Sequence, residues 1–175
     1  TLLRPGDIDF GSLSIRLANF FTGFALITLY LALGTGALAG DLYRILGWMA
    51  LQALATVAAA LVAPFLFMSV EIQETTYRTV LLVLNYHVMV EDVGLLARPD
   101  GFFYEPGVFQ IYLNLYLYLA LFVFRNMRRS LLALAAVLCT QSTTGLLIAL
   151  LLVGAYVLCE LQRVAPGRKV LIAII

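Results

Sequence analysis

The feature that most constrains this chain is the length of its stretches without a charged residue. Two of them, residues 17–40 and 45–70, exceed the roughly 20 residues that a helix needs to cross a bilayer. A charged side chain at the bilayer centre costs a few kcal/mol or more, so long uncharged stretches mark segments that lipid can surround. The charged fraction is 12%, against about 25% in soluble domains. The sequence therefore predicts a protein of the lipid bilayer.

These stretches predict an all-α fold, a polytopic bundle of transmembrane helices. We expect one membrane domain over residues 1–175, with helices at about 17–40, 45–70, 106–124, 130–141 and 145–160. Pro64 should kink or end the second helix, because it lacks a backbone donor. The chain begins without methionine and ends in a short apolar stretch, so we expect part of a larger polytopic protein.

The stretch at residues 79–90 lies between Arg78 and Glu91 and is too short to cross a membrane. We expect it to lie at the interface or to re-enter the bilayer. It carries the single histidine, His87, in a setting more typical of a structural hydrogen bond than of catalysis.

The last long stretch, residues 130–159, is too long for one straight helix across a ~30 Å hydrocarbon core. Its centre reads TQSTTG, and basic residues flank both of its ends. A hairpin broken at this Ser/Thr segment would keep both basic clusters in the cytoplasm, as the positive-inside rule requires. We therefore expect a broken helical hairpin, with the loop before residue 106 on the extracytoplasmic side of the membrane.

Charge and cysteine content exclude further classes. With 11 basic and 10 acidic residues, the chain lacks the concentrated positive charge that a nucleic-acid partner requires. Cys139 and Cys159 lie in apolar stretches, where a thiol usually behaves as a small hydrophobe, so we infer no disulfide.

The most informative segment is the loop LLARPDGFFYEPG at residues 95–107. It contains the turn sequence Pro99-Asp100-Gly101, in which Pro presets φ, Asp bonds its own backbone and Gly accepts a positive φ. Arg98 directly precedes this turn. An Arg held by a rigid turn can make two parallel charge-assisted hydrogen bonds to a phosphate.

Glu105 directly precedes the helix expected to start at Pro106, where it can orient Arg98 or accept a proton from a hydroxyl. The alternative is an interfacial anchor, in which Arg98 meets lipid phosphates and the loop aromatics form a belt. In the following helix, Tyr112 shares a face with other aromatic residues, which suits sugar contact or simple packing.

Two motifs in this order resemble the bacterial O-antigen polymerase and ligase superfamily. The matched region covers about residues 90–160. The first motif consists of Arg98, Gly101, Phe103, Glu105, Pro106 and Gly107, and the second of Ser142, Thr143, Thr144 and Gly145.

The resemblance implies a membrane glycosyltransferase of the bacterial inner membrane. It would polymerise undecaprenyl-pyrophosphate-linked oligosaccharide repeats at the outer face, without a metal or other cofactor. Other polysaccharide-assembly proteins, such as a chain-length regulator, would be its partners. Arg98 and Glu105 would be catalytic, with Arg98 on the pyrophosphate leaving group. The residues that would bind substrate are Gly101, Tyr104, Tyr112, Ser142 and Thr143.

Other functions are compatible with the same residues. An O-antigen ligase would share the chemistry but use a different acceptor. A transporter or flippase fragment would use Arg98 and the broken hairpin as a substrate path. An intramembrane thiol enzyme would pair a cysteine with His87, although apolar surroundings disfavour a thiolate. The last alternative is a structural membrane subunit.

Overall fold

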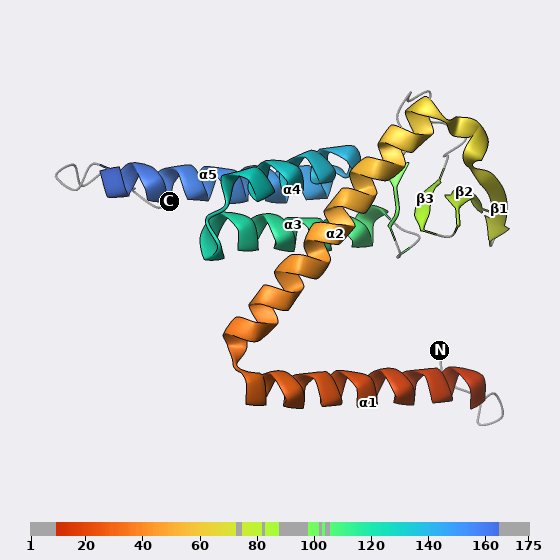
Figure 1. Cartoon of the computed structure of the whole chain (residues 1–175), viewed down its shortest axis with the longest axis horizontal. Coiled ribbons are helices and arrows are strands. Elements are labelled where there is room, and N and C mark those ends of the chain that lie inside the picture. Colours follow the sequence, from red (N-terminus) through yellow and green to blue (C-terminus); the bar gives the residue numbers. More distant parts are fainter. Residues whose placement is uncertain are drawn as a thin grey trace, which may run out of the picture. The chain divides into compact units, whose positions relative to one another are not determined.

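The computed structural model describes residues 10–72, 75–81, 83–87, 98–101, 103 and 106–164 (Figure 1). Most of these residues are helical. The helices are α1 (Phe10–Leu33), α2 (Thr35–Val62), α3 (Pro106–Tyr118), α4 (Met127–Cys139) and α5 (Thr143–Val164), with a 3-10 turn η1 (Pro64–Leu66) and a π-helical turn η2 (Leu119–Val123). The strands are β1 (Met68–Ile72), β2 (Thr75–Val80), β3 (Leu84–His87) and β4 (Arg98–Pro99).

The chain divides into two compact units, one up to Asp41 and one from Leu42 onward. In the first unit, α1 ends at a glycine, Gly34, whose φ of +90° suits a residue without a side chain. The hydroxyl of Tyr30 donates a hydrogen bond of 3.0 Å to the Asp41 carboxylate across this break. The second unit holds the candidate site and is described from here on.

Two helices among the described residues are long and apolar enough to cross a membrane. They correspond to Gly36–Val62 and Thr143–Arg163. Little of the second is buried within the chain, and apolar side chains such as Leu147, Leu150 and Leu151 are exposed along it. The predominantly helical character and the apolar helices agree with the expectation from the sequence.

The expectation of an all-α fold holds for most of the described residues but is wrong for four strands between Met68 and Pro99, which form an antiparallel sheet in the order β1-β2-β3-β4. The helix expected to reach residue 70 ends at Val62, and Pro64 starts the short turn η1. The described part of the stretch at 79–90 forms the end of β2 and β3, with Thr79 paired to Asn85, and its place at the membrane interface stays a prediction. The β-branched and aromatic residues here favour strands, a preference that charge spacing does not detect.

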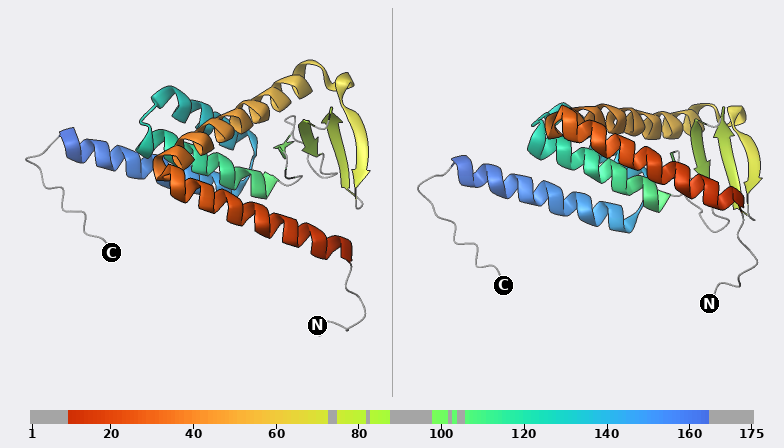
Figure 2. Two further views of the ribbon diagram at one scale, coloured as in Figure 1. Left: turned by 60° about the horizontal axis from the view of Figure 1, so that its bottom comes forward. Right: turned by 90° about the horizontal axis from the view of Figure 1, so that it is seen from below.

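Helices α3, α4 and α5 run in alternating directions, packed side by side (Figure 1; Figure 2 gives two further views). The break expected in the 30-residue apolar stretch is present, since α4 ends at Cys139 and α5 begins at Thr143. At the other reversal, the Asn126 side chain caps α4 by accepting a 3.2 Å hydrogen bond from the Arg129 N–H. The buried core is built from α2, α3, α4 and α5, around Leu46, Ala50, Ala53, Phe109, Leu113, Tyr116, Leu117, Ala133, Ala136, Val137 and Ala149.

The contact between α3 and α5 depends on Gly145. A Cβ atom at this position would lie 2.8 Å from Gln110 Oε1 and 3.1 Å from Gln110 Cβ. The Asn114 side-chain N–H group donates to the Gly145 carbonyl at 3.2 Å and to Gln110 Oε1 at 2.9 Å. A bare backbone therefore lets α5 approach a buried pair of amide side chains on α3, as small residues do between membrane helices.

We predict that Gly145→Ala destabilises the chain by about 1–3 kcal/mol, because the new methyl group overpacks the contact with Gln110. Thermal unfolding in detergent micelles measures the change. Gly154→Ala is the matched control in the same helix, where a Cβ meets nothing within 4 Å and should be neutral or stabilising by up to about 1 kcal/mol. Equal effects of the two substitutions would contradict the packing role of Gly145.

Candidate functional site

The structure brings parts of both sequence motifs to the same end of the helices. Strand β4 pairs with β3, so that Arg98 lies opposite His87 and Pro99 opposite Tyr86. From this strand the Arg98 Nε–H group donates a long hydrogen bond of 3.4 Å to the Thr140 carbonyl, 42 residues further along the chain. Thr140 lies at the start of the α4–α5 turn, two residues before Ser142, so the guanidinium of the first motif contacts the backbone that leads into the second.

The turn after β4 is held by main-chain and side-chain hydrogen bonds from β3. The Asp100 N–H donates to the Asn85 carbonyl at 3.1 Å, and the Asn85 side-chain N–H donates to the Gly101 carbonyl at 3.2 Å. The hydroxyl of Thr79 donates in turn to Asn85 Oδ1. Asn85 is 1% exposed, so these bonds form away from solvent, where each contributes most to the fixed shape of the loop.

Gly101 has the positive φ that the turn sequence predicts, at +61°, and the Phe103 N–H closes the turn on the Asp100 carbonyl at 3.3 Å. A Cβ atom on Gly101 would lie 2.7 Å from the Phe109 ring. Both observations assign Gly101 a backbone role, because the loop could not rest on α3 with a side chain there. Its part in substrate binding stays a prediction.

The polar side chains of the α4–α5 turn mostly form hydrogen bonds with backbone groups. The Thr140 hydroxyl donates to the Val137 carbonyl at 2.7 Å. The Ser142 hydroxyl accepts from the Gly145 N–H at 3.3 Å, which caps the start of α5. Ser142 is half-buried, and Thr143, the first residue of α5, is exposed. Of the two predicted substrate-binding residues in this turn, Thr143 therefore has its side chain available at the surface.

Tyr112 reaches the same region through the loop. Its ring stacks on Phe103, with centroids 4.5 Å apart and planes 4° from parallel, and 38% of its surface is exposed. Arg98, Gly101, Ser142 and Thr143 thus lie on the loop and turn at one end of the helices, and Tyr112 is joined to them by Phe103.

Part of the predicted site lies outside the described residues. Glu105 and Tyr104 are in this group, as are residues 88–97. His87 is described through its backbone in β3. Within the described ranges, no group of three or more His, Cys, Asp or Glu side chains could hold a metal ion.

Sequence reasoning missed the residues that hold the site in shape. Asn85 is the clearest case, a polar residue in the short apolar segment that the charge spacing predicts to be interfacial. Gln110 and Asn114 had a detectable signal, since two amides four residues apart share a helix face. Their partner, the Gly145 backbone, could not be found from spacing because it belongs to another helix.

Comparisons with models of protein families, with curated proteins and with solved structures found no match. The likeness to the O-antigen polymerase and ligase superfamily therefore rests on the two motifs, and the function has to be argued from the geometry around Arg98.

We predict that Asn85→Asp destabilises the chain by about 1–3 kcal/mol, because a carboxylate oxygen replaces the N–H that donates to the Gly101 carbonyl. The carboxylate can still accept from Thr79, so the loss combines the missing bond to the loop with the cost of burying a carboxylate. Thermal unfolding measures it. Asn126→Asp is the control, since this exposed cap still accepts from the Arg129 N–H. An unchanged melting temperature in Asn85→Asp would refute the anchoring role.

Proposed function

We propose that this chain is the part of a bacterial inner-membrane glycosyltransferase that binds the lipid-linked donor. The reaction would polymerise undecaprenyl-pyrophosphate-linked oligosaccharide repeats at the outer face of the membrane. The observation that carries the proposal is the hydrogen bond from Arg98 to Thr140, which joins the first motif to the turn that leads into the second. A chance likeness would not require these distant segments to be neighbours.

Arg98 has the chemistry that the leaving group needs. In the proposed step, an acceptor sugar hydroxyl attacks the anomeric carbon of the donor, and the bond to the lipid pyrophosphate breaks. The electron pair leaves with the pyrophosphate, whose growing negative charge a guanidinium fork stabilises through paired hydrogen bonds. The hydroxyl proton passes to a base, a role that we assign to Glu105 from its place in the sequence.

Half-burial of Arg98 favours this function over a simple interfacial anchor. An anchoring Arg extends its guanidinium outward to lipid phosphates. Arg98 instead uses Nε on the Thr140 carbonyl. Bound in this way, the guanidinium is oriented by the protein before substrate arrives, which is the preorganisation that electrostatic catalysis requires.

The exposed apolar surface of α5 supports a membrane setting. Side chains including Leu147, Leu150 and Leu151 are exposed on its surface. Contact of these apolar side chains with water costs free energy, which contact with lipid avoids. Arg125 lies at the reversal before α4, and Arg128 and Arg129 lie in the first turn of α4. Arg163 lies in the last turn of α5, at the same end of the helices. By the positive-inside rule this end is cytoplasmic, and the end with Arg98 faces outward.

This orientation predicts opposite labelling of two exposed positions. In a cysteine-free background of the full-length protein, Leu81→Cys in the β2–β3 turn should react with an impermeant maleimide added to intact spheroplasts. Arg128→Cys should react after the membrane is opened. Leu81 is 88% exposed, so its label reports the side of the membrane and not burial. The reverse pattern would overturn the orientation.

The proposed reaction predicts that Arg98→Lys reduces glycan elongation by about 100-fold or more, because Lys cannot reproduce the planar fork. The length distribution of lipid-linked glycan in cells carrying the full-length variant measures this. Arg163→Lys is the matched control, since Arg163 is exposed and paired with Glu160 at 3.0 Å. Normal polymer lengths with Arg98→Lys, at normal membrane levels, would refute the glycosyltransferase function.

A further inference from the structure

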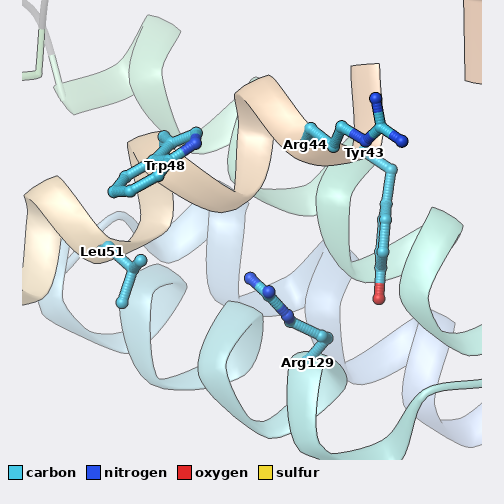
Figure 3. Close-up of a pocket in the computed structure, with 5 residues that line it drawn as sticks. All are labelled: Tyr43, Arg44, Trp48, Leu51 and Arg129. Carbon is cyan, nitrogen blue, oxygen red and sulfur yellow. The ribbon is translucent and has the colours of Figure 1, made fainter. Parts of the chain in front are cut away.

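A second basic site lies between α2 and the start of α4, away from the loop that carries Arg98. It is a pocket of about 320 Å³, shown in Figure 3 and lined by Tyr43, Arg44, Trp48, Leu51 and Arg129. Arg129 extends from α4 toward α2, and the Tyr43 hydroxyl points toward the α4 side (Figure 3). We call this the Arg129 pocket.

The sequence of α2 creates the space for this pocket. Tyr43, Gly47 and Leu51 repeat every four residues and so share one helix face. At Gly47 the missing side chain admits two polar groups. A Cβ there would lie 3.1 Å from the Tyr116 hydroxyl and 3.3 Å from Arg129 Nη1. A phenol from α3 and a guanidinium from α4 therefore converge on the same point of the α2 backbone.

Two of the donors beside the Arg129 pocket are buried without a hydrogen bond to any described residue. They are the hydroxyl groups of Tyr43 and Tyr116. Tyr116 is 0% exposed, and its ring lies 5.3 Å from that of Tyr43, which in turn stacks on Phe124 at 4.2 Å. Packing thus fixes both rings. Burying a hydroxyl without a partner costs free energy, so a ligand oxygen that accepts from the Tyr43 hydroxyl, which belongs to a lining residue, would be stabilised.

The lining selects a phosphate group. The described lining includes the Arg129 guanidinium and no acid, so the local charge favours an anion. A phosphate oxygen can accept from both a guanidinium and phenol hydroxyls, and guanidinium forks match phosphate geometry. Trp48, 74% exposed, and Leu51 add apolar surface at the rim, which suits the glycerol and upper acyl region of a lipid better than a free ion.

We propose that the Arg129 pocket binds the phosphate of an anionic phospholipid, such as phosphatidylglycerol, from the cytoplasmic leaflet. The choice of leaflet rests on the proposed function and its orientation, whereas phosphate recognition rests on the pocket. Basic pockets between helices on the cytoplasmic side bind anionic headgroups in this manner. Bound there, the headgroup would bridge α2 and α4.

The chain's single tryptophan, Trp48, lines the pocket and reports binding directly. The test places the chain in phosphatidylcholine nanodiscs with increasing fractions of phosphatidylglycerol and records Trp48 fluorescence. We expect a saturable change, and Arg129→Gln should weaken the apparent affinity about tenfold or more. Arg128→Gln is the matched control, because it removes the same charge from the neighbouring position, which does not line the pocket. Circular dichroism checks that each variant is folded.

Arg44→Gln gives a second variant if Arg129→Gln does not fold, and it should also weaken the response. Equal losses in Arg128→Gln and in the pocket variants would overturn the proposal, because they would indicate general charge attraction. A separate titration adds inorganic phosphate to phosphatidylcholine nanodiscs. A saturable, Arg129-dependent response to phosphate alone at equal affinity would overturn the lipid as the source. Arg98→Lys should leave the fluorescence response to lipid unchanged. The lipid proposal and the proposed glycosyltransferase function are therefore tested by different measurements, and either can fail alone.

Discussion

The close approach of α5 to α3 at Gly145 is the contact on which the candidate site depends. It places the Gly145 carbonyl against the side-chain amides of Gln110 and Asn114, which are buried between two apolar helices. Because α5 is held there, the turn that precedes it is held too, and the Thr140 carbonyl stays within reach of Arg98. A second bare position, Gly101, lets the loop rest on Phe109 from the other side.

A glycine allows a similar close contact at the opposite end of the helices. Tyr116 and Arg129 pack against Gly47 on α2, as Gln110 packs against Gly145. At one end the Arg98 Nε–H group donates to a backbone carbonyl, and at the other the Arg129 guanidinium lies beside the backbone of Gly47. Under the proposals made above, one end handles the pyrophosphate of the substrate and the other a structural lipid phosphate.

How far the sequence predicts this structure differs between elements. The break in the 30-residue apolar stretch could be predicted, because the stretch is too long for one straight membrane helix and has basic residues at both ends. Pro64 correctly marked the end of α2. The sheet was missed because stretches between charges measure length and polarity. They carry no information on whether Tyr77 or Thr79 will pair with another strand.

For the candidate site, the sequence was a better guide to the segments involved than to the role of each residue in them. Arg98 and the Ser/Thr turn are neighbours, as the order of the motifs suggested. Gly101 and Ser142, however, have backbone roles in the loop and the turn, and the hydrogen bond from Asn85 to the loop was not predicted. These roles depend on contacts between segments far apart along the chain, which local patterns cannot specify.

The most direct test of the proposed site is binding of undecaprenyl pyrophosphate to the purified full-length protein in nanodiscs. The proposal predicts saturable binding that is lost in Arg98→Ala and retained in Arg129→Gln. Binding that survives Arg98→Ala with unchanged affinity, in a variant that folds normally, would contradict the claim that the Arg98 loop and the α4–α5 turn together form the donor site.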